Sequence, residues 1–187
     1  MNFKSLLTVS LATATASVAV PTFSQSATSS EDKVSFSCQE IFDPDSKQIV
    51  SATVAWVSQR SENVPVIYWK SELFSRAAWT PQARCEEVTP KFQTFYDSDR
   101  LNYLTHGKVG AYPVICATLT NNEETCNQDN FLFSLKNDVD GQTALQKLIN
   151  IEFRHNGILI DPPIQTVYVD FNKFLLNAPA VEKNASN

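Results

Sequence analysis

The sequence predicts an α+β domain in which two helices pack on an antiparallel sheet of about five or six strands, braced by two disulfides. Three observations lead to this prediction. Segments with alternating apolar and polar side chains fall into two groups of three, and a helical segment follows each group. The chain also has four cysteines, and its first residues are typical of an exported protein, in which cysteines form disulfides.

The N-terminal segment predicts a signal peptide. Lys4 supplies a short basic start, residues 6–20 carry no charge, and small residues suited to signal peptidase end at Ser24, with Ala19 as an earlier alternative. The apolar stretch is too short for a membrane span. We therefore expect a signal peptide, a flexible leader, a single α+β domain and a loose tail, at residues 1–24, 25–33, 34–177 and 178–187.

The first three strands are expected at residues 34–38, 49–57 and 64–69, where side chains alternate between apolar and polar. Residues 42–46 have the Pro and Asp chemistry of a turn between the first two strands. The second and third strands are expected to form a hairpin. Because proline cannot donate to a ladder, Pro65 confines the start of the third strand to an edge or a strand end.

A helix is expected to begin after Thr80, which is a good N-cap, with Pro81 at the first helical position. Pro90 predicts either a kink or a restart of this helix. Its apolar face is formed by Cys85, Val88, Phe92 and Phe95.

Three further strands and a second helix complete the predicted domain. The strands are expected at residues 101–105, 112–119 and 131–136, with residues 106–110 joining the first two and a polar loop at 121–130 before the third.

Asp140 or a neighbour is expected to cap the second helix, which continues through Phe153 with Leu145, Leu148 and Ile149 facing inward. Residues 167–176 fit a last strand or a short helix, and the pattern does not choose between them.

The four cysteines predict two disulfides. Their spacing has no pair suited to a tetrahedral zinc site, and a catalytic thiol would leave an odd number. Cys116 and Cys126 flank one short connection, and a bridge from Cys38 to Cys85 would join the first helix to the sheet. The rival pairing, Cys38 with Cys116 and Cys85 with Cys126, remains open.

The composition excludes several classes of function. The formal net charge of −5 argues against binding to nucleic acid, which requires clustered Lys and Arg. Only four glycines are present, and no glycine-rich phosphate loop or dinucleotide fingerprint is found. We therefore assign no cofactor, no metal ligand and no catalytic residue.

The sequence contains two weaker candidates for chemistry. His106, in a predicted hairpin tip, has the residue type of a general base. Glu86, Glu87, Asp97 and Asp99 are carboxylates of the kind that hydrolases use in pairs. The simpler interpretation is a solvated turn residue for His106, and helix-end and turn positions for the carboxylates. The same tip provides candidate partner contacts, His106, Lys108 and Tyr112, because hairpin tips are exposed.

Several segments resemble the circadian oscillating polypeptide family of cyanobacteria, in order and in spacing. They extend over about residues 34–153, and the clearest are Trp69, Arg84 to Val88, Leu101 to Thr105, Pro113 to Cys116 and Phe131 to Leu135. The resemblance implies an exported cyanobacterial protein whose founding member is peripherally associated with a membrane and rhythmically expressed. It implies no enzyme activity, cofactor or site.

The expected function is that of an exported, non-catalytic envelope or lumenal module that binds a protein or membrane partner. Its expected location is the periplasm, the thylakoid lumen or the cell exterior. Two alternatives from other classes remain. One is an exported hydrolase that uses carboxylates or His106, and the other is a secreted inhibitor with a disulfide-braced loop between Cys116 and Cys126.

Overall fold

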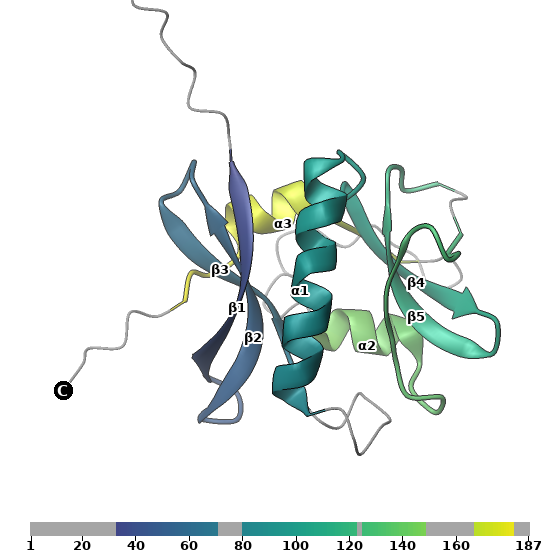
Figure 1. Ribbon diagram of the computed structural model, residues 1–187, viewed down its shortest axis with the longest axis horizontal. Helices are drawn as coiled ribbons and strands as arrows, with labels where there is room; N and C mark the ends of the chain where they lie inside the picture. The colour runs from purple at the N-terminus through teal and green to yellow at the C-terminus, as the bar shows by residue number, and fades with distance from the viewer. Residues whose placement is uncertain (1–32, 71–79, 123–124, 149–166, 182–187) are drawn as a thin grey trace, which may run out of the picture. The chain divides into compact units, whose positions relative to one another are not determined.

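The computed structural model describes residues 33–70, 80–122, 125–148 and 167–181 (Figure 1). The predicted signal peptide and most of the predicted leader lie outside these residues. Within them, the elements in chain order are β1 (Val34–Asp43), β2 (Gln48–Val57), β3 (Glu62–Tyr68), α1 (Pro81–Asp97), β4 (Tyr103–Val109), β5 (Tyr112–Thr118), β6 (Phe131–Ser134), α2 (Gly141–Leu148), β7 (Tyr168–Asp170) and α3 (Phe171–Asn177).

The α+β class is confirmed, and the strands are divided between two antiparallel sheets. One sheet has the order β1-β2-β3, and the other has the order β6-β5-β4-β7. The sequence predicts a single sheet because alternation identifies strands without identifying their neighbours. The two sheets share one core, to which both contribute buried side chains.

The first sheet agrees with the predicted strands, although β1 is longer than expected and includes the first residues of the predicted turn. Asp43 ends β1 as a buried residue, accepts hydrogen bonds from Ser46 and pairs with Lys70 at 2.9 Å. Burial by itself would raise the pKa of Asp43, but the bonds from Ser46 and Lys70 outweigh it and lower that pKa. The β2–β3 hairpin is confirmed, and Pro65 lies in β3, an edge strand.

The first helix begins as predicted. The Thr80 hydroxyl accepts a hydrogen bond from the amide of Ala83, and Pro81 is the first helical residue. The restart at Pro90 is not observed, because α1 continues through this residue to Asp97. Packing on the first sheet supports the helix at Pro90. Thr89, just before the proline, is buried and its hydroxyl hydrogen bonds to the hydroxyl of Thr53 in β2.

The C-terminal part resolves the segment that the pattern left open. Residues 168–170 form β7 on β4, and α3 follows at once, capped by Asp170, whose carboxylate accepts a bond from the amide of Lys173. The predicted helix after Asp140 is present as α2 up to Leu148, and the rest of its expected length lies outside the described residues.

The tail predicted from Ala178 is not loose over its first four residues. Ala178 is buried, the amide of Val181 donates to the carbonyl of Asn63 at 2.7 Å, and Val181 packs against a small apolar cluster on the first sheet. Sequence composition suggested a loose end, but these contacts attach the segment to β3.

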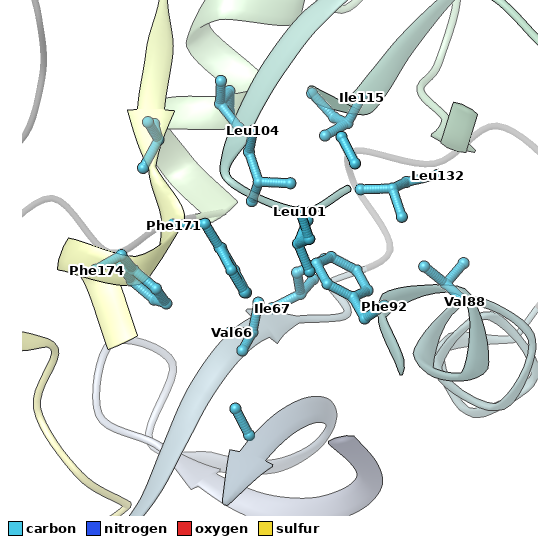
Figure 2. Packing of buried hydrophobic residues seen from close by; sticks show 14 of the residues in the cluster. Val66, Ile67, Val88, Phe92, Leu101, Leu104, Ile115, Leu132, Phe171 and Phe174 are labelled. Atoms are coloured by element: carbon cyan, nitrogen blue, oxygen red, sulfur yellow. The ribbon is translucent and has the colours of Figure 1, made fainter. Parts of the chain in front are cut away.

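The main core lies between the elements that Figure 2 shows. Phe92 of α1 and Phe171 of α3 lie among side chains from both sheets, with Ile67 from the first sheet and Leu104 and Ile115 from the second. Burial of this apolar surface is the main stabilising contribution to such a domain. No helix in the described ranges has both the length and the apolar character needed to cross a membrane.

Candidate functional site

Both predicted disulfides are present with the preferred pairing. Cys38–Cys85 joins β1 to α1 with a Cα–Cα distance of 5.5 Å, and Cys116–Cys126 joins β5 to the following loop with a distance of 5.8 Å. None of the four cysteines is left as a free thiol. Two intact disulfides are typical of an oxidising compartment.

The second disulfide braces the β4–β5 hairpin as well as the loop. A Cβ added to Gly107 in β4 would lie 2.8 Å from both Cβ and Sγ of Cys126, so the loop rests directly on the strand. Only glycine allows this close approach. The hairpin is therefore held by its ladder and by the loop that crosses it.

The turn of this hairpin is shorter than the sequence predicts. Val109 pairs with Tyr112, so that Gly110 and Ala111 alone form the connection, and Gly110 has a φ of +61°. His106, predicted in the tip, lies inside β4 opposite Ile115. The prediction for His106 was wrong because a glycine after it is typical of a turn. In the structure, Gly107 is needed inside the strand, because the Cys126 loop lies too close to it for a Cβ atom.

The three candidate contacts do not share one face. Side chains alternate along a strand, and directly paired residues share a face. Lys108 pairs with Pro113 and shares the face of His106, whereas Tyr112 pairs with Val109 on the opposite face. Tyr112 is 50% exposed and Lys108 is exposed, while His106 is half-buried.

His106 packs beneath the start of α2. A Cβ added to Gly141 would lie 3.0 Å from Cβ and Nδ1 of His106. Its Nε2 atom is buried and has no hydrogen-bond partner among the described residues. Burial lowers the pKa of His106, and the nearby charge of Asp140 opposes this shift. The imidazole is therefore neutral at pH 7, with its ring beneath a helix.

The sequence did not predict the proximity of His106 and Asp140. Asp140 caps α2, because its carboxylate accepts bonds from the amide and the hydroxyl of Thr143 at 2.8 and 2.7 Å. These bonds lower the pKa of Asp140, with a smaller contribution from His106. The cap was recognisable from the sequence, but only the packing of α2 on β4 brings it near the histidine.

The structure separates two of the acidic candidates, Glu86 and Asp97, along α1. Glu86 accepts a bond from Gln82 at 2.6 Å, and Asp97 accepts one from Gln93 at 2.8 Å. The two carboxylates belong to the same helix, eleven residues apart, which corresponds to about 16 Å along its axis. Over the described residues, no three His, Cys, Asp or Glu side chains are placed to hold a metal ion.

The outward face of the first sheet carries an exposed aromatic side chain that the sequence pattern does not reveal. Trp56 of β2 is 41% exposed and lies between Ser35 and Asn63 on the neighbouring strands. The exposed Ile49, an odd number of residues away along β2, lies on the opposite face. Alternation along β2 predicts that Trp56 shares a face with Val54. It could not show which face the core covers.

Comparison with known proteins supports the family resemblance noted in the sequence. Residues 35–176 match a family model described as circadian oscillating protein COP23. The match includes both disulfides and continues past residue 153, where the resembling segments end. No curated protein matches the chain, and no solved structure matches it.

Proposed function

Since this chain belongs to the family of circadian oscillating protein COP23, we propose that it is a non-catalytic binding module that contacts a protein or membrane-bound partner. The observation that carries the proposal is the half-exposed Tyr112, presented at the turn of a hairpin that a disulfide braces. The module is exported to an oxidising compartment, which is the periplasm, the thylakoid lumen or the cell exterior. There it is held peripherally at a membrane through its partner.

The hairpin has the physical properties of a contact element. A braced strand pair loses little conformational entropy on binding, so more of the contact energy is realised as affinity. Tyrosine adds a large amphipathic contact area at low entropic cost. The exposed Lys108, on the other face, supplies a charge that adjusts the orientation and rate of encounter rather than the affinity.

The position of His106 favours a binding role over a hydrolase. A general base must come within hydrogen-bond reach of its substrate. His106 instead lies against Gly141, and Asp140, whose charge acts on it, caps a helix. A structural role for this histidine accounts for both contacts.

The test measures retention of the protein in native membranes or envelopes after a salt wash. Tyr112→Ala should reduce retention about tenfold, as expected for an aromatic hot spot. Trp56→Ala is the matched control, because it removes an exposed aromatic side chain from a different surface. Unchanged retention of folded Tyr112→Ala would discard the hairpin as the contact. Turnover of a peptide, ester or glycoside that His106→Ala abolishes would discard the binding role itself.

A further inference from the structure

The edge strand β1 has backbone groups that point away from its sheet. It is ten residues long and, among the strands of the described ranges, pairs only with β2. In an antiparallel pair, alternate residues direct their N–H and C=O groups outward. The amide of Ser58 bonds to the carbonyl of Lys33, so residue 33 and every second residue after it face β2. The outward residues are therefore Val34, Phe36, Cys38, Glu40 and Phe42.

A side chain of α1 already occupies the first part of this edge. Oε1 of Gln93 accepts a hydrogen bond from the amide of Phe36 at 2.8 Å, and its Nε2 donates to the carbonyl of Val34 at 3.4 Å. The glutamine amide thus imitates one residue of an additional strand. Figure 1 shows α1 alongside β1, and the Cys38–Cys85 bridge holds the two together.

The remainder of the edge is open within the described part of the chain. The outward backbone groups of Cys38, Glu40 and Phe42 have no hydrogen-bond partner there beyond solvent. Exposed edges normally carry lysine, proline or a bulge that prevents pairing with another chain. β1 has no lysine, arginine or proline, and its register with β2 has no bulge. The opposite edge, β3, carries Pro65 and an irregular register.

Two exposed acidic side chains belong to the two elements that the Cys38–Cys85 bridge joins, Glu40 to β1 and Glu86 to α1. Glu40 is exposed and pairs in register with Ser51, whose hydroxyl donates to Gln82 of α1 at 2.9 Å. The amide of Gln82 in turn donates to the exposed Glu86 at 2.6 Å. Neither glutamate belongs to an ion pair formed by described residues.

This charge argues against a second copy of the chain as the occupant. An antiparallel pair of β1 strands centred on the open stretch would place Glu40 opposite its own copy, and like charges directly opposite destabilise a sheet. A segment with a lysine or arginine opposite Glu40 would instead be attracted by its charge.

We infer that the edge of β1 from Cys38 to Phe42 binds an extended segment of another protein as an added strand, with a lysine or arginine of that segment facing Glu40 and Glu86. Main-chain hydrogen bonds supply affinity in this mode of recognition, and the facing side chains supply specificity. This surface and its partner class are separate from the hairpin contact.

The test uses the oxidised protein and a synthetic nine-residue peptide of alternating threonine and valine with lysine at its centre. Amide hydrogen exchange followed by NMR should show at least tenfold slower exchange at Cys38, Glu40 and Phe42 when the peptide is bound. Glu40→Lys should weaken this peptide up to about fivefold and improve binding of a matched peptide with a central glutamate. A peptide N-methylated at alternate residues should not bind.

Tyr112→Ala is the matched control, because it alters the hairpin and leaves the edge intact. If the three amides are protected equally in the parent and in Tyr112→Ala, the peptide binds the edge of β1 and not the hairpin. Absent protection, protection confined to other strands, or protection that rises with protein concentration without peptide would overturn the inference. The retention measurement for the hairpin would be unaffected by that failure.

Discussion

Removing the Cys38–Cys85 disulfide should destabilise the protein more than removing Cys116–Cys126. The comparison uses two paired variants, Cys38→Ser with Cys85→Ser and Cys116→Ser with Cys126→Ser. Each bridge has one fully buried cysteine, so the cost of burying a serine hydroxyl is similar in both variants. The loop that each bridge closes then decides the order.

The magnitude follows from the sequence separations, which are 47 residues for the first bridge and 10 for the second. The chain-entropy treatment converts these into stabilisations of about 4 and about 2.7 kcal/mol at 25 °C. The expected difference between the two variants is therefore about 1.4 kcal/mol.

Urea unfolding measures the difference. Trp69 is almost fully buried and hydrogen bonds to Thr53, so its fluorescence should change on unfolding. With a denaturant slope of about 2 kcal/mol per M, the midpoint should fall by about 2 M without the first bridge and by about 1.3 M without the second. Alkylation of the denatured, unreduced parent protein should add no label, which verifies that both bridges are intact at the start.

The reverse order, or equal midpoints with equal slopes, would refute the loop argument. It would mean that the contact of Cys126 with β4 contributes more than the longer constraint between β1 and α1. A change in the denaturant slope of one variant would show that its denatured state has changed.

Two further predictions concern β4. Gly107→Ala should cost about 1–3 kcal/mol of unfolding free energy in thermal melts, because its Cβ would meet Cys126 at 2.8 Å. Gly110→Ala should cost about 1–2 kcal/mol of unfolding free energy, because an added Cβ there meets no other atom and only the positive φ is strained. A Gly107→Ala variant as stable as the parent would contradict the contact between Gly107 and Cys126. Burial lowers the pKa of His106 below 6.5 in the folded protein, so the unfolded protein takes up a proton at higher pH than the folded one. The free energy of unfolding should therefore decline as the pH falls below about 6.5, and the decline should stop below the pKa of His106 in the folded protein. His106→Gln should remove this decline between pH 7 and 5, and an unchanged pH profile would show that another group is responsible.

Local signals in the sequence predicted much of the fold. Thr80 and Pro81 mark the start of α1 because capping depends on the residues of one turn. Alternation identified the strands, and four cysteines in an exported-type chain indicated two disulfides. Each of these signals is contained within a few residues or within the composition.

The positions of His106 and Gly107 show where such signals fail. A histidine followed by a glycine is typical of a turn, and the sequence contains nothing that reports the loop of Cys126 lying over the strand. The short strand β7 and the helix α3 could not be separated in advance, because three residues are too few to establish a period.

The sequence by itself therefore determined the strands and helices from β1 to the start of α2, the acidic charge and the number of bridges. The tertiary structure alone decided that the strands form two sheets and that His106 lies beneath α2. It also decided that, among the described residues, none continues the pairing of the β1 edge past Gln93. Strand order and burial depend on contacts between residues far apart in the chain. Those contacts are set by how complete elements pack against one another, and no short stretch of sequence specifies them.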